Sequence, residues 1–130
     1  MTDQDIENAI GQHLAGMANC PPIAWPNQDF TPNGSYIEFR HVPGDRVDDT
    51  IDAIGAIQTG IILLTAVVRS GAFASEANAI AGQMATRFPK ALRLPVAGRT
   101  VLINAPASPG TPFQDGVYFR KPVRVFYVTE

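Results

Sequence analysis

Apolar residues near the N-terminus recur at spacings of three and four, the period of one face of an α-helix. This stripe consists of Ile6, Ile10, Leu14 and Met17. Thr2 can cap the helix, and Asp5, three residues later, completes a pattern similar to a capping box. We expect residues 19–22 to end the helix, because the two prolines there cannot continue it.

Other segments have the features of β-strands. Residues 23–25 form a short extended piece, and residues 35–42 alternate between apolar and polar. Residues 55–69 are apolar on both faces and rich in β-branched side chains, which places them at the centre of a sheet. Strands are also predicted at 99–104 and at about 116–128, where Pro122 implies an edge position or a bulge.

The segments between these strands carry turn residues. Pro43, Gly44 and Asp45 predict a turn, and residues 46–52 are polar and fit either a short strand or a loop. Residues 90–98 are expected to form a turn region, and residues 105–115, with three prolines, a loop.

A second helical stripe runs from Ala77 to Phe88, with Ser75 as its expected cap and Pro89 as its stop. The order is therefore helix, strands, helix, strands. This order predicts an α+β fold, in which two helices pack on one face of a mixed, mostly antiparallel sheet. The length of 130 residues is typical of one domain, so we expect residues 1–130 to form a single unit.

Composition narrows the function classes. The net charge of −2 gives no general support for nucleic-acid binding, and a lone cysteine, Cys20, cannot form an internal disulfide. The acidic, polar N-terminus does not resemble a secretory signal. The longest apolar run, residues 61–68, is too short to cross a bilayer. We therefore expect synthesis in the cytoplasm and no membrane insertion.

The templates of enzymes and metal sites do not match this chain. His13 and His41 lack partners at metal-binding spacings and are interpreted as surface or packing residues. No phosphate-binding loop, dinucleotide fingerprint or nucleophile elbow occurs. We expect no catalytic residue, no metal and no cofactor, and a hydrolase with an unrecognised site is the least favoured alternative.

Two charged clusters have alternative interpretations. Asp45, Asp48, Asp49 and Asp52 can hold a hard cation, but their spacing lacks the calcium-loop pattern, so a solvated loop suited to docking is favoured. Arg120, Lys121 and Arg124 are interleaved with aromatic residues, as in some single-strand binders. Because they fall on both faces of a strand, charges on a solvent or interface surface are favoured for them.

Three stretches together resemble the tail terminator-like family of small proteins from tailed phages, prophages and gene transfer agents. The first is Ala-Trp-x-Asn-x-x-Phe-x-Pro at residues 24–32, followed by residues 35–37. The second is the glycine-containing central strand with the alanine-rich helix that ends at Phe88, and the third is residues 114–123, with Gly-x-Tyr-x-x-x-Pro-Val. The resemblance covers roughly residues 3 to 128.

The resemblance implies a structural role in virion assembly. Such proteins form a hexameric ring on the tail tube, stop its polymerisation and offer a surface for head joining. The implied partners are other copies of the chain, the tail tube protein and a head-completion or connector protein. The implied location is the virion tail, after assembly in the host bacterial cytoplasm. Alternatives are another head–tail connector or a small α+β module that binds a ligand or nucleic acid.

A ring needs two different patches on each subunit, because a heterologous interface must close by rotation. The edge strand expected at Pro122 and the loop at residues 43–52 are the candidate elements. We predict that the partner-facing surface includes Arg40, Arg46, Asp48 and Asp49.

Overall fold

The structure is a computed structural model that describes residues 2–32, 34–47, 57–69 and 74–130. It contains two helices, α1 (Asp3–Ala15) and α2 (Ala74–Arg87). Its strands are β1 (Ile23–Ala24), β2 (Tyr36–Val47), β3 (Ile57–Arg69), β4 (Arg93–Val96), β5 (Arg99–Ile103), β6 (Ser108–Pro109), β7 (Phe113–Asp115) and β8 (Tyr118–Thr129).

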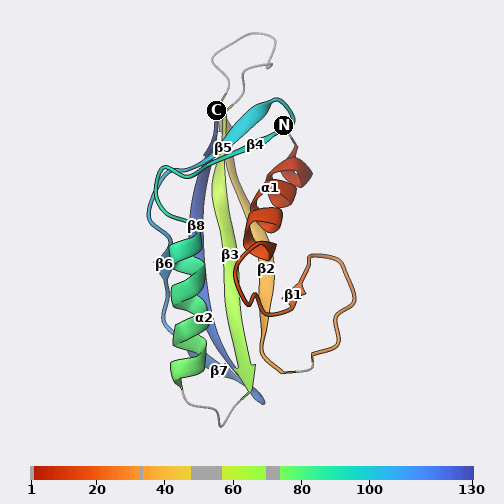
Figure 1. Ribbon diagram of the computed structural model, residues 1–130. Coiled ribbons are helices and arrows are strands. Elements are labelled where there is room, and N and C mark those ends of the chain that lie inside the picture. Colours follow the sequence, from red (N-terminus) through yellow and green to blue (C-terminus); the bar gives the residue numbers. More distant parts are fainter. Residues whose placement is uncertain (1, 33, 48–56, 70–73) are drawn as a thin grey trace.

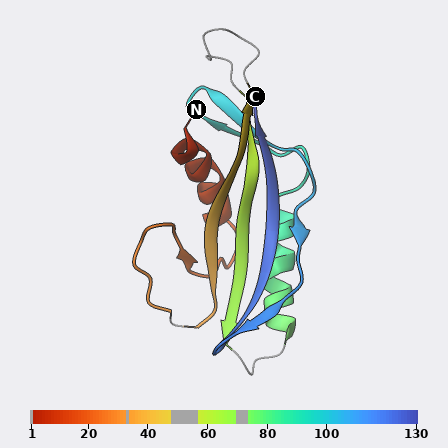
Figure 2. The same cartoon turned by 180° about the vertical axis from the view of Figure 1, so that it is seen from behind.

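All these strands belong to one sheet with the order β1-β2-β3-β8-β5-β4, and the short β6 and β7 also pair with β8. The long strands β2, β3 and β8 are antiparallel neighbours and form the centre of the sheet. The single parallel pair among the described strands is β1 with β2. Both helices lie on one face of this sheet, and Figure 2 shows the other face without a helix among the described residues (Figures 1 and 2). The predicted α+β fold is confirmed.

The N-terminal helix begins where the sequence predicts but ends earlier. The Asp5 amide donates to the Thr2 hydroxyl at 3.2 Å, and the Thr2 amide donates to the Asp5 carboxylate at 2.9 Å. The hydrogen bonds of the capping box lower the pKa of Asp5 below its ordinary value. The helix ends at Ala15 with Gly16 as its cap, whereas we expected residues 19–22 to end it. Glycine has little helical preference, so the chain leaves the helix a turn before the prolines.

Strand β2 continues through the turn predicted at Pro43, Gly44 and Asp45. Its pairing with β3 shifts register between Pro43 and Arg46, as in a β-bulge, and resumes to Val47. A bulge accommodates a proline and bends the strand without ending the pairing, which is why the turn signal misleads here. The predicted strand at 55–69 corresponds to β3, and residues 55 and 56 lie outside the described residues.

Two predicted loops contain short strands instead. In the region 90–98, β4 forms a hairpin with β5 through Ala97 and Gly98, both with positive φ (50° and 75°). Positive φ at both central residues is the geometry of the tight turns that match strand twist. In the region 105–115, β6 and β7 pair with β8. Each is two or three residues long, too short for a pattern to be visible in sequence.

Pro122 does not lie on a sheet edge, contrary to our expectation. It lies inside β8, opposite Thr65 of β3, and β8 has neighbours on both sides. The Pro122 carbonyl accepts a hydrogen bond from the Gly110 amide at 2.7 Å. The nitrogen of a strand residue points to the same side as its carbonyl, so the missing N–H faces the short segment between β6 and β7. Proline is tolerated there because no bond to β3 is lost.

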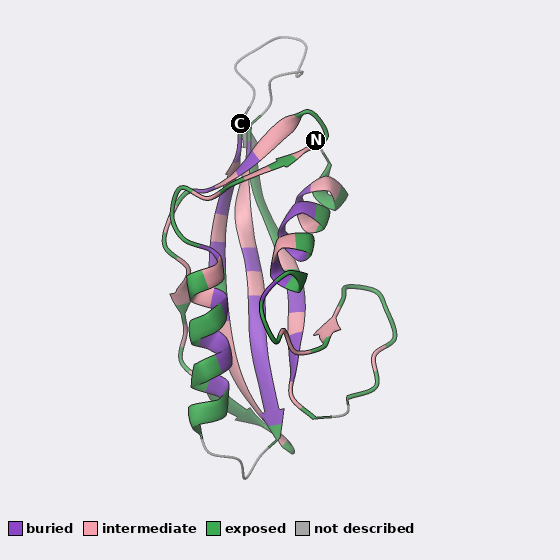
Figure 3. Cartoon of the chain, viewed as in Figure 1, coloured by how far each residue is buried: buried purple, intermediate pink, exposed green. Residues whose placement is uncertain are grey.

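The core lies between the helices and the sheet (Figure 3). Ser75 is the second residue of α2 and not its cap, while the predicted stop after Phe88 agrees with a helix end at Arg87. Each helix buries its predicted stripe against alternate residues of the long strands. The sheet contributes Ile37, Phe39, Ile62, Leu64, Ala66, Val68, Val123, Val125 and Tyr127 to this core.

Candidate interaction surface

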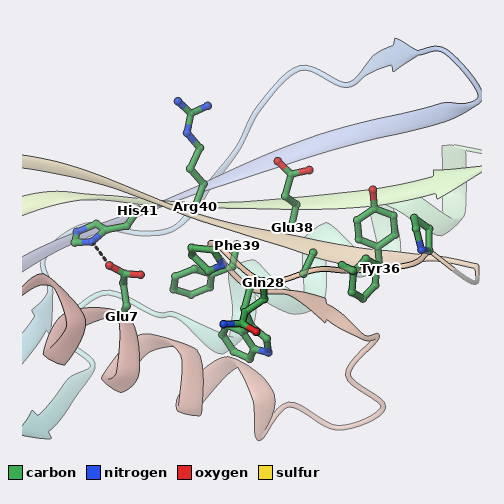
Figure 4. A pocket seen from close by; sticks show the side chains of 12 residues that line it. Glu7, Gln28, Tyr36, Glu38, Phe39, Arg40 and His41 are labelled. Carbon is green, nitrogen blue, oxygen red and sulfur yellow. Dashed lines mark hydrogen bonds and ion pairs between the residues drawn. The ribbon is translucent and has the colours of Figure 1, made fainter.

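The face of the sheet opposite the helices is the main surface left uncovered by the described residues. Side chains alternate along a strand, so the residues between the core positions of β2 point to this open face. Figure 4 shows Glu38 and Arg40 on the side of β2 opposite to Phe39 and His41. We use the name open face for the alternate residues of β2, β3 and β8 that point away from the helices.

The strand registers arrange the open face in rows across three strands. From one end of the sheet to the other, the rows are Val42–Ile61–Phe126, Arg40–Leu63–Arg124, Glu38–Thr65–Pro122 and Tyr36–Val67–Arg120. Neighbours in such a row are close enough for their side chains to interact.

Aromatic and charged side chains cover the last of these rows. Tyr36 packs between Phe30, at a ring distance of 4.8 Å, and Tyr118, at 6.2 Å. Val67, in the middle of this row, is fully buried although it lies outside the core under the helices. This end of the open face is therefore already covered by the chain itself.

Arg120 is neutralised within the chain. It donates to the Glu38 carboxylate at 2.6 Å and to the Asp115 carboxylate at 2.9 Å, which ties β8 to β2 and β7. Burial disfavours the charge of Arg120, but its hydrogen bonds and its negative neighbours outweigh that effect and raise its pKa. We therefore interpret Arg120 as a structural residue.

Arg40 and Arg124 are in a different position. Both are exposed, and Leu63, half-buried, lies between them in the same row. Arg124 approaches Ser108 at 3.5 Å and the ring of Phe126 at 5.8 Å, and among the described residues no carboxylate pairs with it or with Arg40. The two arginines border a hollow of about 270 Å³, whose other lining residues include Leu63, Thr65, Phe113 and Pro122. Glu38 and Arg120, which pair with each other, also line this hollow. Its charge without a described carboxylate partner therefore comes from Arg40 and Arg124, and it suits a partner that carries carboxylates.

A second depression lies beside the free edge of β2. Beyond Glu38, none of the described strands pairs with this edge. The depression measures about 540 Å³ and is lined by Trp25, Gln28, Phe39 and other residues (Figure 4). Trp25 remains 39% exposed, and its ring lies 5.4 Å from that of Phe39. A side-chain carbon at Gly11 would lie 2.8 Å from the indole, so glycine allows α1 to approach Trp25. Trp25 thus links β1, α1 and β2.

Glu7 and His41, which line this depression, bond to other groups of the chain. His41 Nδ1 lies 3.1 Å from the Glu7 carboxylate, and His41 Nε2 lies 2.6 Å from the Tyr127 hydroxyl. Because a carboxylate only accepts, His41 donates from Nδ1 to Glu7, and the Tyr127 hydroxyl completes the contact at Nε2. The His41 side chain is 5% exposed. This network fastens α1 to β2 and β8, so His41 is a packing residue, as is His13 beside Phe88.

The buried position of Tyr127 predicts that the stability of the fold changes at alkaline pH. Burial, with smaller contributions from the negative charges of Asp3 and Glu7, raises the pKa of Tyr127 to about 12. A folded-state pKa above the ordinary value near 10 stabilises the fold fully below about pH 10. We expect this contribution to be lost as the pH rises from about 10 to about 12.

The variant Tyr127→Phe keeps the ring and lacks the titrating group. Urea unfolding between pH 9 and pH 12 should show the stability gap between wild type and variant narrowing as the pH rises. In a titration of tyrosinate absorbance, the variant should lack the latest step among the three tyrosines. Parallel stability profiles for the two proteins would contradict this assignment.

The structure describes only some of the residues predicted for the partner surface. Arg40 is exposed on the open face, and the backbone of Arg46 lies in β2 after the bulge. Asp48 and Asp49 lie outside the described residues, as does Asp52 of the acidic cluster. Sequence reasoning did not select Leu63 or pair Arg124 with Arg40. Both relationships depend on the strand order, for which the sequence offers no direct signal.

Two further features of the described residues concern metal-binding groups and membrane-spanning helices. These residues contain no group of three or more His, Cys, Asp or Glu side chains arranged to hold a metal ion. None of the helices in the described part of the chain is both long and apolar enough to cross a bilayer.

Cys20 is half-buried and donates to the Pro21 carbonyl at 3.3 Å, and burial raises the pKa of its thiol. A raised pKa disfavours the reactive thiolate.

Comparison with known proteins gives three results. A family model described as "Phage tail terminator protein" matches residues 5–127. A solved structure matches with a TM-score of 0.82 and 24% sequence identity, covering 100% of this chain and 96% of the other. At this identity the match supports the fold alone. No curated protein matches the chain.

Proposed function

Because this chain belongs to the phage tail terminator family, we propose that it forms a ring that caps the tail tube and stops its polymerisation. The same ring provides the surface that the head joins. The family is one of structural phage proteins and not of enzymes, so the chain is a component of the phage tail with a role in virion assembly. The match over residues 5–127 is the observation that carries the proposal.

The architecture supports assembly with copies of the same chain. The open face and the free edge of β2 are two surfaces that meet at Glu38 and Arg40, and a heterologous ring interface uses two patches on each subunit. The described strands all join one sheet, which supports our inference that residues 1–130 act as a single domain. We propose a hexamer as the closed form, with the tail tube protein and a head-completion protein as its partners. Assembly takes place in the host cytoplasm.

The mass of the purified protein tests this proposal. We expect light scattering over a wide concentration range to give the mass of six chains, either for the protein alone or after addition of the tail tube protein. A protein that stays monomeric under both conditions would contradict the ring and favour another head–tail connector role.

Alanine variants test the proposed partner surface. Arg40, Arg46, Asp48 and Asp49 lie on or next to it in our proposal, so each single substitution should weaken ring formation or tube binding. Charged residues at an interface rim contribute modestly, so we expect losses of roughly twofold to tenfold per variant. Circular dichroism should show an intact fold in each. Normal assembly of all four variants would rule out this surface.

A further inference from the structure

We propose that the hollow bordered by Arg40, Leu63 and Arg124 binds the loop between β1 and β2 of a second copy of this chain, with Asp29 as the carboxylate that the arginines hold. The inference rests on the proposed ring and specifies which surface of one subunit meets which segment of the next. We call the hollow the acceptor and residues 25–32 the donor loop.

The acceptor carries charge that the chain does not neutralise. Arg40 and Arg124 flank Leu63 on adjacent strands, which places their backbones about 9–10 Å apart. Arg120, which also lines the hollow, donates to two carboxylates, whereas among the described residues neither Arg40 nor Arg124 has one. A carboxylate has two oxygens that accept hydrogen bonds, so one placed above Leu63 can accept from both arginines.

The donor loop projects from the subunit and carries the opposite charge. Figures 1 and 2 show the chain after β1 leaving the body of helices and sheet before it returns to β2. Asp29 is the only charged residue of the donor loop. Its side chain is exposed, and among the described residues no cation pairs with it. The loop therefore presents one carboxylate that is available to a partner.

Two aromatic rings anchor the donor loop on either side of Asp29. Trp25 packs against Phe39, with ring centroids 5.4 Å apart, and Phe30 packs against Tyr36 at 4.8 Å. The residues between the two anchors are exposed. A loop that is held at both ends loses less conformational freedom when it binds, so less of the binding free energy is spent on ordering it.

The donor loop of the same chain does not fill the acceptor. Its anchor Phe30 packs on Tyr36, which precedes Arg40 by four residues of β2, roughly 13 Å along the strand. Arg124 lies on β8, two strands beyond β2. Asp29 makes no ion pair with either arginine. We therefore infer that the acceptor receives the donor loop of a neighbouring copy.

The donor loop and the acceptor are different patches, so each copy can use both at once. The loop leaves the sheet at the edge formed by β1 and β2, whereas the acceptor lies over β2, β3 and β8. Contacts of this kind join each copy to two neighbours and close into a ring when the rotation between copies permits. A reciprocal exchange of loops between two copies would give a dimer instead, and the mass of the assembly distinguishes the two.

Charge reversal tests the contact directly. The acceptor variant Arg40→Glu/Arg124→Glu and the donor variant Asp29→Lys should each raise the concentration at half-assembly by at least about tenfold, because like charges then face each other. Lys90→Glu changes the net charge at an exposed residue outside both surfaces and is the control. Sedimentation velocity measures assembly, with tail tube protein present if wild type requires it, and circular dichroism checks that each variant is folded.

An equimolar mixture of the acceptor variant and the donor variant is the second arm of the experiment. In the mixture, the lysine of the donor variant meets the glutamates of the acceptor variant, and the native loop of the acceptor variant meets the native arginines of the donor variant. Opposite charges face each other again at every contact, so the mixture should assemble within roughly threefold of wild type. The two chains must alternate, which an even-numbered ring such as the proposed hexamer permits.

The outcomes separate the inference from the proposed function. If wild type forms a ring and the reversed variants assemble equally well, the inference is overturned and the function stands; weaker binding of the acceptor variant to the tail tube protein would then assign the hollow to the tube. Folded, defective variants that mixing does not rescue would also overturn the inference. A dimer that shows both the reversal and the rescue would support the contact and contradict the ring. A wild-type protein that stays monomeric under every condition would contradict both.

Discussion

Replacing Phe88 with alanine is expected to lower the free energy of unfolding by about 3–5 kcal/mol. Phe88 follows α2 directly and is fully buried within the core. Its ring meets the imidazole of His13 edge-on at 5.2 Å. Alanine removes this contact and leaves a cavity that the surrounding sheet and helices cannot easily fill.

The hydrogen bonds around Phe88 explain why the site should relax little. The His13 Nε2 nitrogen donates to the Arg87 carbonyl at 2.9 Å, and the Arg87 Nε nitrogen donates to the His13 carbonyl at 2.8 Å. These reciprocal bonds join the C-terminal ends of α1 and α2 and fix the backbone on both sides of the ring. Because these bonds hold the backbone, the cavity left by Phe88→Ala should collapse little. The loss in free energy of unfolding should therefore lie in the upper part of the range of about 3–5 kcal/mol.

Urea unfolding followed by circular dichroism measures the effect, with Phe113→Ala as the matched control. Phe113 is 50% exposed on β7, so its replacement should change the free energy of unfolding by no more than about 0.5 kcal/mol. Phe113 also lines the hollow beside Arg40 and Arg124, so the control is informative for stability and not for assembly. Equal effects of the two substitutions would contradict the packing role of Phe88.

The elements predicted from sequence are those with a long local pattern. The stripe of α1, the alanine-rich stripe of α2 and the apolar run of β3 each repeat over many residues, so their period is visible without the fold. The strands β4, β6 and β7 are four residues or shorter and exist because β5 and β8 offer pairing edges. Such strands form because a neighbouring strand pairs with them, and a single sequence does not show which strands become neighbours.

The same distinction applies to the candidate surface. The exposure of Arg40 follows from the alternation of residues 35–42, so a sequence pattern could place it. The relation of Arg40 to Leu63 and Arg124 requires β3 to lie between β2 and β8. For Pro122 the local chemistry is predicted correctly and the position in the sheet is not. Proline lacks the N–H for a ladder hydrogen bond, as expected, but it faces the segment between β6 and β7 and not an edge of the sheet.

Gly60 is the second position where a small change should have a large effect. It lies on β3 opposite Tyr127 of β8 and Pro43 of β2. A side-chain carbon there would lie 2.5 Å from the Tyr127 hydroxyl and 2.9 Å from the Gly44 nitrogen. The absence of a side chain lets the Tyr127 phenol cross β3 and reach His41 on β2, 2.6 Å away. Gly60 is therefore required by the network that fastens α1 to the sheet.

We expect Gly60→Ala to lower the free energy of unfolding by about 2–4 kcal/mol, which combines overpacking with the loss of a buried hydrogen bond. The control is Gly82→Ala on the exposed side of α2, where an added carbon meets nothing within 4 Å. That substitution should stabilise the protein by up to about 1 kcal/mol, because alanine favours the helix. A Gly60 variant as stable as wild type would show that Tyr127 can move aside.

A double-mutant cycle separates the clash with the hydroxyl from the clash with the backbone. In a Tyr127→Phe background the closest atom to the added carbon is gone, whereas the Gly44 backbone remains. We expect Gly60→Ala to cost less there than in wild type, with an interaction energy of at least about 0.5–1 kcal/mol. The Cζ ring carbon of residue 127, 2.9 Å from the added carbon, also remains in that background. If the cost is the same in both backgrounds, the restriction at Gly60 comes from the β2 backbone and this ring carbon and not from the hydroxyl. In that case the His41–Tyr127 hydrogen bond does not require glycine at this position, and the glycine is needed because β2 and the ring of residue 127 pack closely against β3.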